Sequence, residues 1–504
     1  MNLRHDTVAA GVELDDIQGL LRFGFKHHTE AVFLLLRIKD RAAARQWLGQ
    51  ARVSSAVSLE PLPKTVLQVA LTRAGMQALG VGTEVVNGFS EEFLEGMSGD
   101  PNRARRLGDI GANASDHWDW GSGAREPHVA VLMYALPGNL AEFQRTTEAG
   151  CAAGFDVIYR LGTTDMGGVE PFGFADGLSQ PQIDWSRLLP AADVAQLGYR
   201  NLSCLGEFIL GYPNEYGLYT PRPVLSAERD PNNSLPRAED DPGSADLGRN
   251  GTYLVIRQLR QDVQGFWQAM DERAGGIEAE RERLASQLVG RTLTGAPIVT
   301  DAPAAASAAT GSAPDLNAFT FESDPAGHRC PIGAHIRRAN PRTADLPPGG
   351  IGAVSQLIRT LGLAAKSRAQ DLAASARFHR LLRRGREYGV RITAEQALEP
   401  LAPPESGLHF VCLNANIQRQ FEFVQSAWIM GTKFNGLHEE SDPLLGSRLP
   451  GSAGTRCDYF TMPRADGASR RLTKLPQFVS VAGGAYFFLP GIRALRFLAS
   501  SAAG

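Results

Sequence analysis

The sequence predicts an α+β protein that contains two copies of one strand-and-helix unit. Three observations support this prediction. Apolar, β-prone runs alternate with segments of helical composition, two distant parts of the chain repeat the same pattern, and a region rich in Gly, Pro and Asn separates them. Such an order is typical of helices that cover one face of an antiparallel sheet.

The first copy has the order strand, helix, strand, strand, helix, strand. A short helix ending at Gly80 and a long loop over roughly 81–127 interrupt it. This order is that of a ferredoxin-like unit. The strands are expected at 31–38, 64–72, 128–137 and 156–162, and the main helices at 41–52 and 139–155.

The second copy repeats this pattern. Residues 252–270 parallel residues 32–50, because each segment is an apolar strand with an Arg near its end, followed by a helix that carries a Trp. Residues 407–429 parallel the strand and helix at 128–155, and 483–499 supply a last strand and a terminal helix. We therefore expect two ferredoxin-like domains with antiparallel sheets.

The domain boundaries follow from the region between the copies. Residues 1–223 are expected to form the N-terminal ferredoxin-like domain with its appended GxxDG segment. Residues 224–251 are polar, are punctuated by Pro and Gly, and predict an irregular surface loop. Residues 252–504 are expected to form the C-terminal domain.

Composition excludes several functions. The 504 residues are 43% hydrophobic and 21% charged with a net charge of −3, which gives no basic surface for nucleic acid. No run of 18 apolar residues indicates a membrane span. The N-terminus lacks an apolar signal region and a twin-arginine pair, so we expect a cytoplasmic protein. Five scattered cysteines without a C-x-x-C pair disfavour a disulfide framework, a zinc ribbon and an iron–sulfur cluster.

One acidic residue stands in an apolar setting. The stretch PFGFADGLSQP at 171–181 places Asp176 between Gly173 and Gly177. The acid belongs either to an ordinary Gly-Asp-Gly turn against the core or to a site where a cation lies opposite it.

One histidine has surroundings that suit a haem. His335 lies in CPIGAHIRRANPR (330–342), with an apolar stretch before it and Arg337, Arg338 and Arg342 after it. An imidazole can ligate haem iron while guanidinium groups pair with the two propionates. By itself this pattern is weak, because a histidine beside basic residues is usually part of a solvated loop. No spacing of His, Asp and Glu indicates a multi-ligand metal site.

A third stretch supplies the missing cation. RFHRLLRRGREYGVR (377–391) carries Arg383, which follows His335 by 383 − 335 = 48 residues. A cation that enters an apolar pocket requires an acid or a developing negative charge nearby. Asp176 is the candidate for that acid.

Together the three motifs resemble those of the dye-decolorizing peroxidases, a family of haem peroxidases. The matching residues are Gly173 to Gly177 for G-x-x-D-G, His335-Ile336-Arg337 for the proximal motif, and Arg383 in RRGREYG for the distal arginine. The similarity extends from about residue 10 to about residue 495. It implies the two ferredoxin-like domains predicted above, with haem held largely by the C-terminal half.

The resemblance also implies a reaction and a set of site residues. The protein would bind haem b (iron protoporphyrin IX) through His335 and use hydrogen peroxide to oxidise dyes, phenolics and other small or bulky aromatic donors. Asp176 and Arg383 would be catalytic, and Arg337 is the expected partner of a propionate. His335 should also donate a hydrogen bond through its second ring N–H, and Glu422 is the candidate acceptor. Glu422 can equally well be interpreted as an ordinary solvated residue on a helix.

Three alternatives stay open at the level of sequence. A haem enzyme of this fold could be mainly an oxygenase or a catalase-like enzyme. A haem-binding or haem-trafficking protein is disfavoured, because storage needs no acid of the Asp176 kind. A haem-free α+β binding protein would leave all three motifs structural. The sequence does not give the oligomeric state, and a homo-oligomer is compatible with it.

Overall fold

The structure is a computed structural model that describes residues 8–189, 201–299, 316–342, 375–400, 405–448 and 457–500. The strands of the main sheet are β1 (Glu30–Ile38), β2 (Thr65–Leu71), β3 (Val129–Ala135), β4 (Phe155–Gly162), β9 (Thr252–Gln261), β10 (Leu382–Arg383), β11 (Arg386–Gly389), β12 (Ser406–Asn414) and β15 (Val479–Leu489). Short strands outside it are β5 (Gln182–Ile183), β6 (Leu202–Ser203), β7 (Val224–Leu225), β8 (Ala245–Asp246), β13 (Phe460–Met462) and β14 (Arg470–Leu472).

The helices differ widely in length. The main ones are α1 (Arg41–Gln50), α2 (Arg73–Leu79), α6 (Leu140–Cys151), α7 (Val263–Ala274), α8 (Glu278–Val289) and α14 (Ile492–Ala499). Shorter ones are α3 (Thr83–Val86), α4 (Glu91–Glu95), α5 (Pro101–Leu107), α10 (His335–Ala339) and α13 (Ala394–Ala397). Residues Gln418–Glu422 and Val424–Ile429 are π-helical. Within the described ranges, no helix has the length and apolar character that a membrane crossing requires.

The nine described strands of the main sheet are antiparallel and lie in the order β10-β12-β9-β15-β2-β3-β1-β4, with β11 also paired to β12. The first half of the chain contributes β4-β1-β3-β2, and the second half contributes β15-β9-β12-β10 in the equivalent order. These are the two predicted ferredoxin-like units, and the prediction of the fold class is confirmed. The units join edge to edge where Phe488 of β15 pairs with Leu71 of β2.

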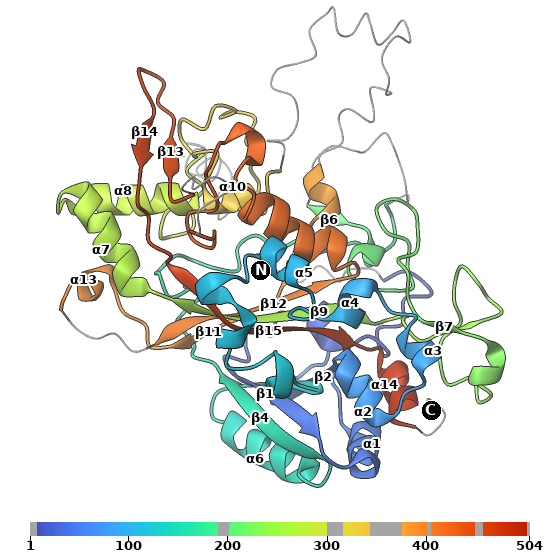
Figure 1. Cartoon of the computed structure of the whole chain (residues 1–504). Helices are drawn as coiled ribbons and strands as arrows, with labels where there is room; N and C mark the ends of the chain where they lie inside the picture. The colour runs from blue at the N-terminus through green and yellow to red at the C-terminus, as the bar shows by residue number, and fades with distance from the viewer. Residues whose placement is uncertain are drawn as a thin grey trace, which may run out of the picture.

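The same local signal starts the first helix of each unit. Asp40 follows β1 and accepts a hydrogen bond from the amide of Ala43, and Asp262 follows β9 and accepts one from the amide of Gly265. A side-chain oxygen at this position satisfies an amide that the helix itself leaves unpaired. Figure 1 shows α1, α2 and α14 gathered at the lower right of the view, and α7 and α8 at the upper left.

Both faces of the sheet are covered, but by different kinds of structure. Helices cover one face, where Leu34 of β1 and Val255 of β9 belong to the same core as Leu48 of α1 and Phe266 of α7. Irregular segments cover the other face, where the neighbouring side chains pack against two stretches near residues 17–21 and 205–212. This burial on both sides explains why β1 and β9 are continuous apolar runs instead of alternating ones.

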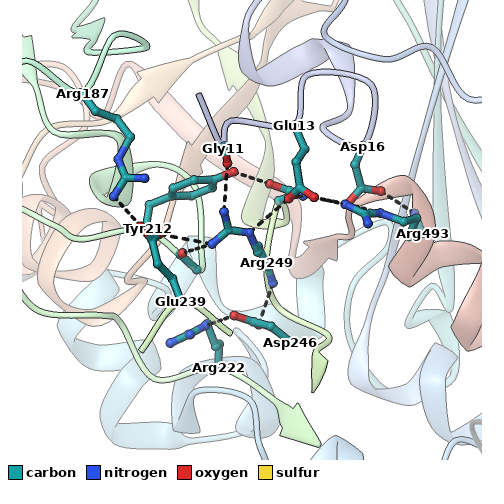
Figure 2. A network of polar contacts seen from close by, with 12 residues as sticks. Gly11, Glu13, Asp16, Arg187, Tyr212, Arg222, Glu239, Asp246, Arg249 and Arg493 are labelled. Carbon is teal, nitrogen blue, oxygen red and sulfur yellow. Dashed lines mark hydrogen bonds and ion pairs between the residues drawn. The ribbon is translucent and has the colours of Figure 1, made fainter. Parts of the chain in front are cut away.

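The 224–251 loop is irregular, as predicted, but it is not only a surface loop. Asp246 and Asn250 in it are fully buried. Arg249 lies at the centre of the polar network in Figure 2, where its guanidinium contacts Glu13 at 3.1 Å and Glu239 at 3.3 Å and lies over the ring of Tyr212. The loop thereby fastens the N-terminal segment to the second half of the chain.

The network extends to the C-terminal helix. Arg493 of α14 pairs with Glu13 and, at 3.2 Å, with Asp16 (Figure 2). Arg222 pairs with Asp246 at 2.6 Å, and the amide of Arg249 donates to the other oxygen of that carboxylate at 2.8 Å. Charge pairs thus hold together three segments from different parts of the sequence, and the Arg222–Asp246 pair is buried on both sides. The boundaries 1–223, 224–251 and 252–504 stay a prediction.

Candidate active site

A cavity lies on the helix-covered side of the second half of the sheet. The segment around Asp176 forms one side of it, and α10 and the π-helical residues contribute other parts of its lining. Most of the wall is apolar: Phe172, Phe174, Leu259, Phe410, Phe421, Val424, Trp428, Leu444 and Val479. The charged and titratable side chains that reach it are few, and they include Asp176, His335 and Arg383.

Asp176 and Arg383 meet in this cavity. Arg383 Nη1 lies 3.5 Å from Asp176 Oδ1, and each side chain is about one third exposed, at 36% and 32%. The backbone amide of Arg383 donates to Gln180 Oε1 at 3.0 Å, and Arg383 Nη2 donates to the carbonyl of Ser179 at 3.2 Å. The segment that follows Asp176 is therefore bound to β10, which fixes the distance between the two charges.

Glycines shape the turn that carries Asp176. Gly173 has a φ of +98° and Gly177 a φ of +70°, values that side chains with a Cβ rarely adopt. The amide of Asp176 donates to the carbonyl of Gly168 at 3.1 Å, and the amide of Ala175 donates to the carbonyl of Leu293 at 2.9 Å. The glycines let the chain turn tightly enough to place the carboxylate at the cavity wall.

His335 is the first residue of α10, and a buried carboxylate fixes its ring. His335 Nδ1 lies 2.9 Å from Asp442 Oδ2, and the other oxygen of Asp442 accepts hydrogen bonds from the amides of Leu444 and Leu445, each at 2.9 Å. Burial opposes charge on Asp442, but His335 outweighs this effect and lowers the pKa of the Asp442 carboxyl below its ordinary value.

The ionised carboxylate determines which ring nitrogen stays available. Burial would lower the pKa of the His335 imidazole, but the charge and hydrogen bond of Asp442 raise it above its ordinary value. Because Nδ1–H donates to Asp442, Nε2 is the nitrogen that can bind a metal. Among the described residues there is no group of three or more His, Cys, Asp and Glu that could hold an ion. A single imidazole oriented in this way suits an iron whose other ligands come from a macrocycle.

The cavity also has more cations than acids. Its charged lining consists of Arg291, Arg342, Arg380 and Arg383 against two carboxylates, Glu170 and Asp176. Burial, together with the charges of Arg342 and Arg383, lowers the pKa of Arg291 to about 10. This surplus of buried positive charge fits a bound group that carries carboxylates, as a haem does. With the apolar wall and the free nitrogen of His335, the residues present fit a haem.

Comparisons with known proteins lead to the same family. No protein-family model matches the chain. A multifunctional dye peroxidase from Amycolatopsis sp. is 28% identical over 528 residues, covering 98% of this chain and 97% of the relative. A dye-decolorizing peroxidase from Mycetinis scorodonius is 26% identical over 522 residues, covering 98% of this chain and 88% of the relative. The chain is a relative of the dye-decolorizing peroxidases.

Solved dye-decolorizing peroxidases have the same fold over almost the whole chain. An ancestral D-type enzyme superposes with a TM-score of 0.72 at 25% identity. The enzyme from Auricularia auricula-judae superposes with a TM-score of 0.71 at 24% identity. In both cases the match covers 97% of this chain and 100% of the solved chain. The fold predicted from the duplicated pattern is therefore that of the dye-decolorizing peroxidases.

Two of the predicted site residues, Arg337 and Glu422, do not line the cavity. Arg337 is fully buried, and its guanidinium donates to the carbonyls of Asp324 and Cys330 at 3.0 and 2.8 Å. Successive residues of a helix are about 100° apart, so Arg337 lies about 200° around α10 from His335. The arginine of this motif that lines the cavity is Arg342, which lies beyond the end of α10.

Glu422 is also corrected by the structure. Its carboxylate accepts hydrogen bonds from Arg103 Nε at 2.7 Å and from the hydroxyl of Tyr486 at 2.9 Å, away from His335. Asp442 takes the position expected for Glu422. The only local signal for Asp442 is the sequence SDPLLG, in which an acid precedes a proline, and this signal indicates a turn and not a partner for histidine.

Proposed function

We propose that the protein is a haem peroxidase of the dye-decolorizing type. It binds haem b through His335 and uses hydrogen peroxide to oxidise dyes, phenolics and similar aromatic one-electron donors. The observation that carries the proposal is the placement in one cavity of the Asp176–Arg383 pair and the Asp442-oriented His335. The names of the relatives and the solved neighbours support it.

Asp176 is the proton-transfer group. Its carboxylate accepts a proton from hydrogen peroxide in the cavity and returns that proton to the oxygen that leaves as water. Such a group has to lie within hydrogen-bond reach of the reacting oxygen, and the exposed part of Asp176 lines the cavity.

Arg383 supplies positive charge beside Asp176. At 3.5 Å, its guanidinium attracts the Asp176 carboxylate and helps to hold it at the cavity wall. The same guanidinium stabilises negative charge that develops on the leaving oxygen as the O–O bond breaks. Hydrogen bonds that Arg383 donates to the carbonyl of Ser179 and to the side-chain oxygen of Gln180 keep it in place before peroxide binds.

His335, oriented by Asp442, is the residue that would bind the haem iron. When bound, a haem supplies the redox-active iron that transfers electrons from the donors to peroxide. His335 Nε2 would be its protein ligand, and Asp442 orients the ring and makes Nε2 a stronger donor through Nδ1. Arg342 and Arg380 would hold the haem carboxylates.

Phenolic donors are proposed from the chemistry of the relatives. One solved dye-decolorizing peroxidase, with 22% identity and a TM-score of 0.69, is a complex with 2,6-dimethoxyphenol. A phenol of this type is therefore the first donor to test. The cytoplasmic location and the oligomeric state stay predictions.

The deciding experiment is the optical spectrum of the purified protein before and after one equivalent of hydrogen peroxide. We expect a Soret band that peroxide changes and that 2,6-dimethoxyphenol restores. Haem without a spectral change would indicate a binding or trafficking protein, and oxygen release without donor oxidation would indicate a catalase-like enzyme. Failure to bind haem after reconstitution would refute the assignment.

A further inference from the structure

A second carboxylate of the cavity, Glu170, belongs to the turn that carries Asp176. The amide of Glu170 donates to the carbonyl of Phe174 at 2.9 Å, and the amide of Gly173 donates to the carbonyl of Glu170 at 2.7 Å. The side chain folds back over the same turn, where Oε2 accepts from the amide of Phe172 at 3.1 Å and Oε1 from the amide of Phe174 at 3.0 Å. Four hydrogen bonds thus connect Glu170 to the residues just before Asp176.

The carboxylate of Glu170 is itself anchored to the sheet. Gln261 Nε2, at the end of β9, donates to Glu170 Oε2 at 2.7 Å. Gln261 Oε1 is buried and has no partner among the described residues. Rotation of this amide by half a turn would present Oε1 to a protonated Glu170, so Gln261 can bind either protonation state.

Two aromatic residues of α7 hold the outer side of the turn. Phe172 packs on Phe266 of α7 with 4.6 Å between ring centroids, and Phe174 stacks on Trp267. The indole N–H of Trp267 donates to the carbonyl of Phe172 at 3.2 Å. Glu170 holds the inner side of the same turn.

We propose that Glu170 is a positioning residue for Asp176: its carboxylate, anchored by Gln261, holds the 170–176 turn so that Asp176 faces Arg383. This inference rests on the function proposed above and adds a residue that acts through Asp176 without touching peroxide. Protonation of Glu170 removes an acceptor from the amide of Phe172 or Phe174, and the turn then loosens. The reaction with peroxide should therefore respond to the charge of Glu170.

The surroundings make that charge sensitive to pH near neutrality. Among the described residues, no Arg or Lys lies within ion-pair distance of Glu170, and its carboxylate accepts hydrogen bonds from the amides of Phe172 and Phe174 and from Gln261 Nε2. Burial, with a contribution from the charge of Asp176, raises its pKa to about 7. Other charged groups of this region include His335 on α10, Arg383 on β10 and Glu387 on β11, which interacts with Asp176. Arg291 and Arg342 line the same cavity, and Arg391 donates to the carbonyl of Met166.

The principal variant is Glu170→Gln in the haem-loaded protein, because glutamine has the shape of a protonated glutamic acid. It should slow the reaction with hydrogen peroxide about 10- to 100-fold, since a small misplacement of a reacting group has effects of this size. At every pH it should behave like the low-pH form of the wild type. Saturation by the aromatic donor should be unchanged.

Asp165→Asn is the matched control. Asp165 lies on the same segment, is exposed, and also accepts a backbone hydrogen bond, from the amide of Gly167 at 2.9 Å. It does not line the cavity. This variant should keep the wild-type rate with peroxide and the wild-type pH profile.

A second readout does not depend on turnover. Hydrogen–deuterium exchange of a peptide that covers residues 168–176 should be faster in Glu170→Gln than in the wild type, and unchanged in Asp165→Asn. After correction for the intrinsic exchange rate, protection of this peptide should increase as pH rises through neutrality in the wild type and in Asp165→Asn, but not in Glu170→Gln. Equal protection of this peptide in Glu170→Gln and the wild type would contradict the positioning role.

Gln261→Leu tests the anchor without changing Glu170. Loss of the Nε2 donor makes the carboxylate less stable, so the neutral-pH inflection of the peroxide rate should move to higher pH instead of disappearing. A wild-type rate and pH profile in both Glu170→Gln and Gln261→Leu would overturn the proposal. Failure of the wild type to bind haem or react with peroxide would instead overturn the proposed function, while exchange in 168–176 would still decide the role of Glu170.

Discussion

Asp176 and Arg383 are separated by about two hundred residues, yet their charged groups lie 3.5 Å apart in the cavity. Each belongs to a motif that would be weak by itself. Their contact explains why an acid is tolerated in an apolar turn, because an unpaired charge in such a place would be unfavourable. At the scale of single residues, the proposed reaction depends on a few pairs of side chains.

The Asp176–Arg383 pair can be tested directly. Asp176→Asn removes the proton acceptor, and Arg383→Leu removes the positive charge, so each should retain haem and slow the reaction with peroxide by about 10²- to 10⁴-fold. Stopped-flow spectra with peroxide in excess measure this rate. Wild-type rates in both variants would show that other groups move the proton.

Asp442 provides the corresponding test on the other side of the cavity. Asp442→Asn should keep the hydrogen-bonding shape but lose the charge that orients His335, with haem affinity reduced by about 10- to 100-fold. Titration of the variant with haem, followed at the Soret band, measures the change. Glu422→Gln should leave haem affinity unchanged, because Glu422 contacts Arg103 and Tyr486 instead.

Glu170 should also affect stability as a function of pH. Its pKa is raised in the folded protein from 4.5 to about 7, so it contributes stability that is fully present below pH 4.5 and is lost as pH rises through about 7. The free energy of unfolding of the wild type should therefore fall over this interval relative to that of Glu170→Gln. Denaturant unfolding of both proteins at a series of pH values checks the sign, and a constant difference would contradict it.

At the scale of elements, the turn before Asp176 depends on glycine. Gly173 has a φ of +98°, where a Cβ is strained although the surrounding space is open. Gly173→Ala should destabilise the protein by about 1 to 2 kcal/mol and slow the reaction with peroxide, because the turn shifts. Gly162→Ala is the control, since Gly162 has an ordinary φ and nothing within 4 Å of an added Cβ. Thermal melting compares the two variants.

Sequence patterns were most informative about the positions of helices and strands. The strand at 31–38 and the helix at 41–52 appear as β1 and α1, and their repeat at 252–270 appears as β9 and α7. Long apolar runs followed by a capping Asp are local signals, so one segment suffices to predict them. The helix predicted within 407–429 is π-helical over Gln418–Glu422 and Val424–Ile429, and its periodicity gave no sign of that.

Side-chain direction was much less predictable. Arg337 lies two residues from His335, and Arg342 lies seven, yet only Arg342 lines the cavity. The number of residues between two positions does not say which way a short helix faces once it packs. Asp442 was missed for a related reason, since its partner lies 107 residues away in the chain.

For the whole molecule, the network around Arg249 connects parts of the chain that the sheet does not. It joins Glu13 of the N-terminal segment, Glu239 and Asp246 of the 224–251 loop and, through Glu13, Arg493 of α14 (Figure 2). Glu13 keeps a lowered pKa although burial opposes its charge, because Asn250, Arg493 and Arg249 surround it. The network is therefore a joint between the two halves.

Arg249→Met tests how much this network contributes to the free energy of unfolding. It removes one of two arginines from Glu13, which keeps Arg493, and one of two from Glu239, which keeps Arg187. The loss of these charged hydrogen bonds should cost about 1.5 to 3 kcal/mol of the free energy of unfolding. Arg229→Met, which breaks a surface ion pair with Glu84, should cost no more than about 1 kcal/mol. Urea unfolding followed by circular dichroism measures both. A similar small loss in both variants would show that the network contributes little.

The sequence by itself determined the duplicated α+β pattern, the main strands and helices, and the three motifs that pointed to Asp176, His335 and Arg383. These features rest on local periodicity and on residue types within short windows. Tertiary structure decided which distant groups meet: Asp442 and not Glu422 beside His335, Arg342 and not Arg337 in the cavity, and Glu170 with Gln261 behind the Asp176 turn. Contacts of this kind depend on how strands and loops far apart in the chain pack together, and no local pattern encodes that packing.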